Sequence, residues 1–366
     1  MKKTILLNPG PTNVSESVRN AIKTQDICHR EPEFSEVLQR IRNNLLKVVG
    51  GEKTHTIIPF VASATGSNEA VISSIYGKIL LISNGKYSER LGEIAKWYRI
   101  PIKELKFHPL KPIDLKIIEK ALRNDKKISH IVLVHHETTT GMLAPLRKIG
   151  SLAKKYGKIL FADTVSSVGG HDINARLDNL SFFTVNSNKC LESFPGISFV
   201  IARKDDLVKV KGKSRSFYFN LYEQWKYAEE KGQTPFTPAV QLFYAVDKAI
   251  QELLEEGLGN RIQRYKRMKN ILKSGLKDLG FRFVLPDQLQ SNILLAVKLP
   301  INMDYWEVHD LLKKNGFVIY SGQKNLDQGI FRIAPLGSIT EKEIISFLRE
   351  FKKILTRIGL RPKYSL

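Results

Sequence analysis

This 366-residue sequence contains two cysteines, and it is short of acidic residues relative to basic ones. Cys28 and Cys190 lie far apart and lack the spacing of metal ligands, so we expect neither a disulfide framework nor a metal site. A reducing, cytoplasmic location is the expectation for such a chain. The stretch 1–8 has too short an apolar run for a signal peptide, and no later run is long enough to span a membrane.

The shortage of acidic residues leaves a formal net charge of +22, from 58 Lys and Arg against 36 Asp and Glu. A surplus of this kind can indicate binding to nucleic acids or to anionic membranes. Here, however, the lysines are spread along the chain, without an arginine-rich arm or a basic helix interleaved with aromatic residues. Many fall on predicted helix faces in solvent. We therefore predict no specific nucleic acid and no membrane as partners, and at most a general attraction for anionic substrates.

The length of the chain suits one large domain followed by a smaller one. In the first part, short apolar runs alternate with helical stretches, which predicts a largely parallel sheet with right-handed crossovers and a last, antiparallel strand. The predicted strands are 57–61, 79–82, 131–134, 159–162, 182–185 and 199–202.

The pattern changes near residue 255, where a lysine-rich helix over 261–279 begins a different arrangement. It is followed by predicted strands 281–285, 293–297, 318–320 and 330–333 and predicted helices 305–315 and 341–355. We therefore predict a large domain over 1–255, with an N-terminal segment 1–15, and a small α+β domain over 256–366.

A carboxylate and a lysine follow two of the predicted strands directly. Asp163 ends the run 159–162, and Lys189 comes just after 182–185. Ligand sites in open α/β sheets collect at the carboxyl ends of strands. The pair suits pyridoxal 5′-phosphate (PLP), because a lysine can form a Schiff base with it while an acid pairs with its pyridinium nitrogen. Taken alone, such a pair is more often a surface ion pair, so the interpretation depends on the rest of the chain.

Other segments are compatible with the same cofactor. The small residues 62–67 open a helix and could cradle a phosphate, although they match neither the P-loop nor the dinucleotide pattern. Tyr87 could stack on a heteroaromatic ring or fill the edge of the core. Arg332 stands alone in an apolar strand, where it must meet an anion, either a structural carboxylate or a ligand. His135 and His136 lack the i,i+4 spacing that favours metal binding, and we expect them to be structural.

With these residues laid out, the chain resembles the class V, fold-type I PLP-dependent aminotransferases over essentially its whole length. The resemblance implies an α/β large domain with a mostly parallel seven-stranded sheet and a smaller C-terminal α+β domain. The segments that carry it are 8–12 (NPGPT), 84–87 (NGKY), 137–141 (ETTTG), 163–170 (DTVSSVGG), 187–190 (SNKC) with 195–196 (PG), 221–225 (LYEQW), 236–238 (FTP), 316–320 (GFVIY) and 331–333 (FRI).

The resemblance also implies roles for individual residues. Lys189 would hold PLP covalently and later move the proton, and Asp163 would pair with the pyridine nitrogen. Tyr87 occupies the position of a ring-stacking aromatic residue, and Thr139 lies near the ring hydroxyl. The phosphate-cradle positions are Ser63, Ala64 and Thr65, with Asn188 beside them.

Further residues are implied at the subunit interface and at the substrate. Thr237 corresponds to a residue that reaches the phosphate in the partner subunit, which implies a homodimer with shared sites. Arg332 matches the arginine that binds the anionic end of the substrate, and Arg30 could assist it. The family usually has glycines where this chain has Ala62 and Ala64, so the cradle could be shaped differently.

The members that this chain resembles most move an amino group from 2-aminoethylphosphonate to pyruvate, giving phosphonoacetaldehyde and alanine, or run the reverse. One alternative is a class V enzyme with an alanine–glyoxylate or serine–glyoxylate pair, which shares the cofactor residues. A more remote alternative is a basic nucleic-acid-binding protein on a transaminase scaffold, against which the Asp163 and Lys189 pair argues.

Overall fold

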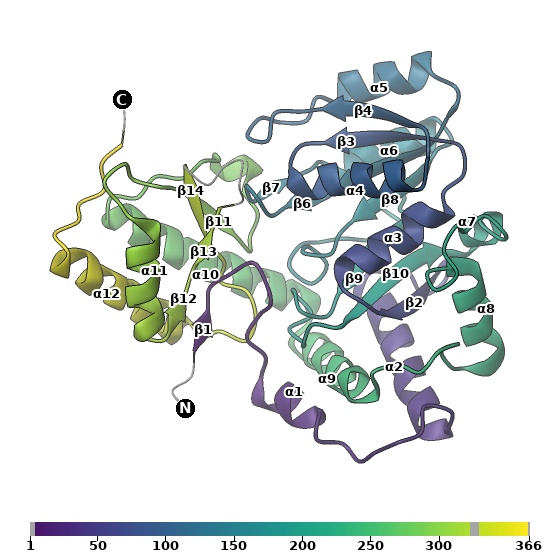
Figure 1. Cartoon of the computed structure of the whole chain (residues 1–366), viewed down its shortest axis with the longest axis horizontal. Helices are drawn as coiled ribbons and strands as arrows, with labels where there is room; N and C mark the ends of the chain where they lie inside the picture. The colour runs from purple at the N-terminus through teal and green to yellow at the C-terminus, as the bar shows by residue number, and fades with distance from the viewer. Residues whose placement is uncertain (1–3, 323–328, 365–366) are drawn as a thin grey trace.

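The structure, a computed structural model, describes residues 4–322 and 329–364 and has two parts (Figure 1). The first part is built on a seven-stranded sheet with the order β2–β10–β9–β8–β5–β3–β4. Its strands are β2 His55–Val61, β3 Lys78–Ser83, β4 Ile102–Lys106, β5 Ile128–Val134, β8 Ile159–Asp163, β9 Phe182–Asn186 and β10 Ile197–Arg203.

Strand directions confirm the predicted α/β class. The neighbours from β9 through β8, β5 and β3 to β4 are parallel, while β10 is antiparallel to both β9 and β2. Every predicted strand of this part is present. The strand β4 was not predicted, because it lies at the sheet edge and its sequence, Ile-Lys-Glu-Leu-Lys, is half-buried and mostly polar.

Helices cover both faces of this sheet, because side chains alternate along each strand. Ile131 and Leu133 of β5 belong to a core with the helices α2, α5, α6 and α9, whereas Val132 and Val134 face a core with α3, α4, α7 and α8. The helices of this part are α1 Glu16–Ala21, α2 Pro32–Val48, α3 Ala64–Ser74, α4 Lys86–Trp97, α5 Leu115–Asn124, α6 Leu146–Lys155, α7 Lys204–Lys209, α8 Leu221–Lys231 and α9 Val240–Glu256. A hairpin of β6 His136–Glu137 and β7 Met142–Leu143 follows β5.

The second part has its own core and a three-stranded antiparallel sheet with the order β11–β14–β13. Its elements are α10 Leu258–Asp278, the 3₁₀ turn Asp287–Leu289, β11 Leu295–Lys298, α11 Tyr305–Lys314, β12 Phe317–Val318, β13 Tyr320–Ser321, β14 Ile330–Ile333 and α12 Glu341–Arg357. The predicted strand 281–285 is wrong, since Phe283 makes only a single bridge to Val297. The predicted strand 318–320 is divided between β12 and β13.

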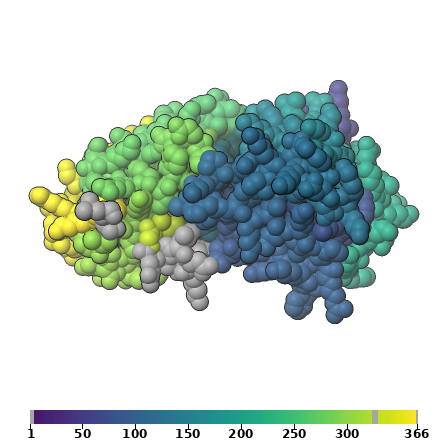
Figure 2. Space-filling view, turned by 90° about the horizontal axis from the view of Figure 1, so that it is seen from above, coloured from purple at the N-terminus to yellow at the C-terminus, as the bar shows by residue number. Residues whose placement is uncertain are grey.

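The N-terminal segment crosses to this second part. Its strand β1 Ile5–Leu6 pairs in parallel with β12, and Ile5 and Leu7 are buried in the core around α10 and α12. Seen from above, the green and yellow second part lies directly against the blue part of the chain (Figure 2). The domain boundary near residue 255 stays a prediction. None of the helices within residues 4–322 and 329–364 combines the length and apolar character needed to cross a membrane.

Candidate active site

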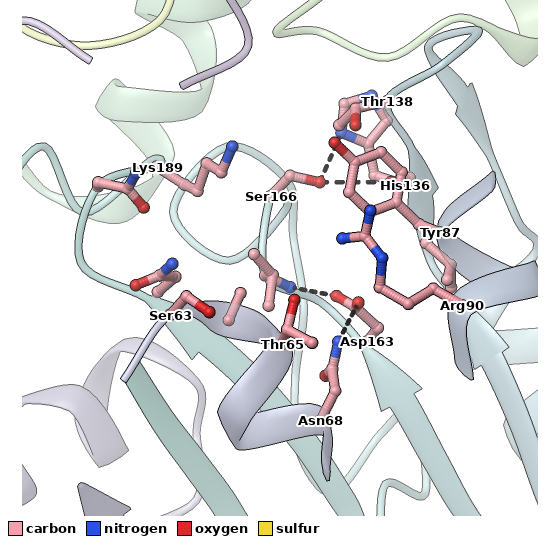
Figure 3. Close-up of a pocket in the computed structure, with 15 residues that line it drawn as sticks. Ser63, Thr65, Asn68, Tyr87, Arg90, His136, Thr138, Asp163, Ser166 and Lys189 are labelled. Atoms are coloured by element: carbon pink, nitrogen blue, oxygen red, sulfur yellow. Dashed lines mark hydrogen bonds between the residues drawn. The ribbon is translucent and has the colours of Figure 1, made fainter. Parts of the chain in front are cut away.

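A cavity opens at the carboxyl ends of β5, β8 and β9, where the sequence predicted a ligand site (Figure 3). Asp163 is the last residue of β8, Val134 is the last of β5, and Lys189 lies three residues beyond the end of β9. Because these strands are parallel neighbours, their ends bring the lysine and the carboxylate to the same cavity.

Asp163 is buried at the floor of this cavity and is held in one orientation. Its carboxylate accepts hydrogen bonds from Asn68 Nδ2 at 2.7 Å and from the backbone N–H of Val165 at 3.0 Å. Asn68 is itself fixed by the Thr184 hydroxyl, which donates to its Oδ1 at 2.7 Å. Burial raises the pKa of Asp163, while these donors and the charge of Lys189 oppose the rise. The carboxylate is therefore suited to a cationic N–H donor in the cavity.

Lys189 lies opposite, with its amine turned to the N-terminal segment. Its Nζ donates to the carbonyl oxygen of Pro9 at 2.7 Å, across 180 residues of sequence. Burial lowers the pKa of Lys189 to about 8. About a tenth of the amine is therefore neutral at pH 7, far more than for an ordinary lysine, and the neutral form is what a nucleophile or a proton acceptor requires.

The N-terminus of α3 forms a third wall. Ser63, Ala64 and Thr65 line the cavity there, and the Ser63 side chain makes no hydrogen bond to cap the helix. Unpaired N–H groups and the helix dipole make such an end favourable for a phosphate. Among the described residues, non-glycine residues with positive φ are Arg99, Asn179 and Glu192, so the alanines at 62 and 64 replace glycine without backbone strain.

Several buried polar atoms in the cavity wall have no hydrogen-bond partner in the described part of the chain. These are His136 Nε2, Asn186 Oδ1 and Asn188 Oδ1. Burial lowers the pKa of His136 to about 3, so its ring is neutral at physiological pH. Unpaired buried polar atoms are costly, and a polar ligand in the cavity would satisfy them.

Tyr87 lies on the upper side of the cavity, where α4 begins. Its backbone N–H donates to Glu137 Oε2 at 3.1 Å, and the guanidinium carbon of Arg90 lies 5.2 Å from the centre of its ring. Arg90, Asn68 and His136 line the cavity but were not predicted as site residues. For Arg90 a signal existed, since it lies three residues after Tyr87 and so on the same helix face.

Arg332 is fully buried in β14 beside this cavity. It donates through Nη1 to the carbonyl of Thr138, a residue that lines the cavity, and through Nε and Nη2 to the carbonyl of Ser321. Its guanidinium carbon lies 4.7 Å from the centre of the Tyr320 ring. Within residues 4–322 and 329–364, no carboxylate forms an ion pair with it. The structural alternative, a carboxylate partner, therefore finds no support in the described chain.

Besides Arg332, three predicted site residues lie outside the cavity wall in this single chain. The Thr139 hydroxyl donates to Glu137 Oε1 at 2.7 Å, and Thr138 lines the cavity in its place. Thr237 is exposed between α8 and α9. Arg30 is bound to the same connection through the carbonyls of Thr234 and Pro235. Their predicted roles stay predictions, and that of Thr237 requires a partner subunit.

Comparison with known proteins places the chain in a family. The family model described as aminotransferase class-V matches residues 6–341, so the chain belongs to the class V aminotransferases. The protein is therefore an aminotransferase.

Curated relatives of this chain are named for a particular activity within the family. A 2-aminoethylphosphonate–pyruvate transaminase of Bacillus mycoides (strain KBAB4) is 35% identical over 347 residues, 93% of this chain and 94% of the relative. A bifunctional phosphonoacetaldehyde hydrolase/aminoethylphosphonate transaminase of Clostridioides difficile (strain 630) is 36% identical over 361 residues. That match covers 96% of this chain but only 56% of the relative, so this chain spans little more than half of that protein.

Solved structures show the same fold. An alanine–glyoxylate aminotransferase from Nostoc sp. superposes with a TM-score of 0.91 at 24% identity, covering 97% of this chain and 96% of the other. A ureidoglycine–glyoxylate aminotransferase from Bacillus subtilis gives a TM-score of 0.92 at 22% identity, covering 100% of this chain and 96% of the other. At these sequence identities the structural similarity is evidence for the fold alone.

The class V aminotransferase family implies PLP as the cofactor, and the cavity fits it. Asp163 can accept a hydrogen bond from a ring nitrogen, Lys189 can reach an aldehyde carbon, and the α3 N-terminus can receive a phosphate. The unpaired Asn186 and Asn188 oxygens and His136 nitrogen are further polar positions for such a group.

Proposed function

We propose that this protein transfers the amino group of 2-aminoethylphosphonate to pyruvate, giving phosphonoacetaldehyde and alanine, or catalyses the reverse reaction. The observation that carries the proposal is Arg332, a buried guanidinium beside the cavity with no carboxylate partner in the described chain. Both substrates bring an anionic group, a phosphonate or a carboxylate, to which a planar donor can bind through two hydrogen bonds. The names of the curated relatives favour this pair of substrates.

PLP, when bound, supplies an electron sink for the carbon from which a proton is removed. With PLP bound, Asp163 would keep the ring nitrogen protonated, and the N-terminus of α3 would hold the phosphate. Lys189 would take the proton from the substrate carbon on its Nζ and move it between the substrate and the cofactor. Arg332 fixes the anionic end of the substrate, so that the reacting carbon lies within reach of the amine.

The alanine–glyoxylate or serine–glyoxylate alternative shares these cofactor residues and differs in the amino donor. The solved structures with glyoxylate in their names are below 25% identity, so they do not favour it. A cysteine-dependent lyase is disfavoured, because Cys190 is buried and burial raises the pKa of its thiol to about 12. The homodimer, the contribution of Thr237 to a partner's site and the cytoplasmic location remain part of the proposal.

The proposal is tested with purified protein loaded with PLP. We expect 2-aminoethylphosphonate alone to remove the visible absorbance of the lysine-bound cofactor, and pyruvate to restore it as alanine appears. A response to alanine, serine or glutamate but not to the phosphonate would contradict the proposed donor. No absorbance change on adding PLP itself would contradict the cofactor.

A further inference from the structure

The amine of Lys189 is held by a backbone segment that belongs to a different part of the fold. The segment 7–13 starts beside the second part, where Leu7 donates to the carbonyl of Val318 and accepts from the N–H of Ala334. At its other end, the Asn13 side chain accepts from the N–H of Leu6 at 2.7 Å. The carbonyl of Asn13 accepts from Ser338 at 2.9 Å. The segment is thus anchored on both sides of Pro9, whose carbonyl points at the Lys189 amine.

The backbone of Gly10 packs against the end of the Lys189 side chain. Its φ is +124°, and a Cβ at this position would overlap the Lys189 Nζ and come within 2.9 Å of its Cδ and Cε. The end of the lysine side chain therefore lies directly against the glycine backbone. Any larger residue would both strain the turn and displace the amine from the Pro9 carbonyl.

We propose that the Pro9–Gly10 turn is a docking site for the free Lys189 amine, which holds the amine while it moves the proton between substrate and cofactor. This inference rests on the proposed transamination. A neutral amine has two N–H groups and one lone pair, so it can donate one N–H to Pro9 and still accept a proton. After taking the proton from the substrate carbon, the ammonium keeps the same bond to Pro9 and can release a proton to the cofactor carbon. The lysine ends in the state in which it began.

A backbone carbonyl suits this task better than a carboxylate would. A paired carboxylate stabilises the ammonium strongly and raises its pKa, which lowers the neutral fraction, whereas a neutral acceptor orients the amine with a smaller loss of the neutral form. The same turn is also linked to Arg332, which we propose binds the anionic end of the substrate. Ala334, which donates to Leu7 two residues before Pro9, lies two residues after Arg332 in the chain. The segment that contains Pro9 and the residue directly after the strand that contains Arg332 are thus joined by a backbone hydrogen bond.

The test is Gly10→Ala in the full chain, with two readouts besides turnover. The first is the rate at which cofactor-free protein takes up PLP as a function of pH. We expect its midpoint to move to lower pH than in the unchanged protein, because an acceptor that favours the ammonium is lost. The second is the single-turnover rate with 2-aminoethylphosphonate alone. We expect it to fall about 100-fold, the scale of a misplacement near 1 Å, with a larger isotope effect for donor deuterated at the reacting carbon.

Gly280→Ala is the matched control. Gly280 has a φ of +87°, and the atom nearest to the place that a Cβ would occupy there lies 3.6 Å away, in Pro362. This variant therefore reports backbone strain alone, and we expect its uptake profile and isotope effect to be unchanged. An equal effect of Gly280→Ala, or an unchanged midpoint and rate in Gly10→Ala, would overturn the proposal.

Asn13→Ala provides a second variant that adds no atom near the lysine and loosens only the anchoring of the segment. We expect the uptake midpoint and the single-turnover rate to change in the same directions as in Gly10→Ala, with effects about ten times smaller. If Gly10→Ala does not fold, unchanged uptake and rate in Asn13→Ala would overturn the docking role. Failure of the proposed substrate is recognised separately, since the PLP uptake profile requires no amino donor.

Discussion

Two basic side chains face the cavity from different parts of the molecule, Lys189 partly buried and Arg332 fully buried, and they differ in what burial does to them. Lys189 follows β9 of the seven-stranded sheet, and Arg332 lies within β14 of the three-stranded sheet. Burial lowers the pKa of both side chains. For Lys189 the result is about 8, so the amine loses its charge at accessible pH, whereas an arginine remains charged.

Lys189 and Arg332 also differ in the number of their contacts. In the hydrogen bonds of the described chain, Lys189 donates to one carbonyl, whereas Arg332 donates to two carbonyls and lies over a tyrosine ring. In the proposed reaction Lys189 forms and breaks bonds and has one such contact, whereas Arg332 presents a constant charge and is held on several sides. Burial alone therefore does not distinguish the two side chains, whereas residue type and the number of contacts do.

The largest expected effect is that of Lys189→Ala, which removes the titratable amine. We expect turnover to fall by at least about 1,000-fold, since both the covalent attachment and the proton transfer are lost. Absorbance after adding PLP and single-turnover rates are the measurements, with Lys155→Ala, an exposed lysine on α6, as the control. Full activity in Lys189→Ala would remove this residue from the mechanism.

The next effect is that of Arg332→Lys, which keeps the charge but loses the planar, two-pronged donor. We expect kcat/KM for 2-aminoethylphosphonate to fall on the order of 100-fold, mostly through KM. PLP uptake should be retained, because Arg332 does not line the cofactor cavity. An unchanged KM would show that the anion binds elsewhere.

Two arginines with carboxylate partners sharpen the contrast with Arg332. Arg261, which is buried, and Arg264, which is partly buried, both belong to α10 and pair with Glu192, in the loop just after Lys189, at 3.4 Å and 2.8 Å. We expect Glu192→Gln to lower the free energy of unfolding by about 2 kcal/mol, since it leaves these two guanidinium groups with one carboxylate fewer. Denaturant unfolding measures this.

Glu230→Gln makes the same chemical change in an exposed i,i+4 pair with Lys226 and serves as the control. We expect less than about 0.5 kcal/mol there. Equal effects at the two positions would mean that the buried network contributes no more than a surface pair.

The smallest effect is a pH dependence in the unchanged protein. Because burial lowers the pKa of Lys189 to about 8, the neutral fraction and hence the PLP uptake rate should rise with pH and level off above about 8. Below that midpoint the rate should fall about tenfold per pH unit. Continued rise beyond about pH 10 would indicate a lysine with an ordinary pKa.

Much of the large sheet could be predicted from the sequence, because buried parallel strands are continuous apolar runs. The positions of Asp163 and Lys189 followed from the runs that precede them. The half-exposed β4 and the short α7 carry no such pattern and were not predicted. The second part was predicted less well, because its strands are only two to four residues long and one expected strand, 281–285, did not form.

Cavity side chains that come from different helices and from the β6–β7 hairpin were the least predictable. Asn68 carries no local signal for the cavity, the sequence alone favours a structural role for His136, and Arg90 is indicated only by its place three residues after Tyr87 on the same helix. They line the cavity because α3, α4 and the hairpin after β5 start at the same sheet edge.

The sequence by itself determined the α/β class, the strand ends that carry the acid and the lysine, and the family. Those properties are local, since they depend on periodicity within short segments and on residues in fixed order along the chain. Only the tertiary structure decided that Arg332 has no carboxylate partner in the described chain and that Pro9, 180 residues away, holds the Lys189 amine. Contacts at such separations depend on how the two parts pack, which no pattern within one segment records.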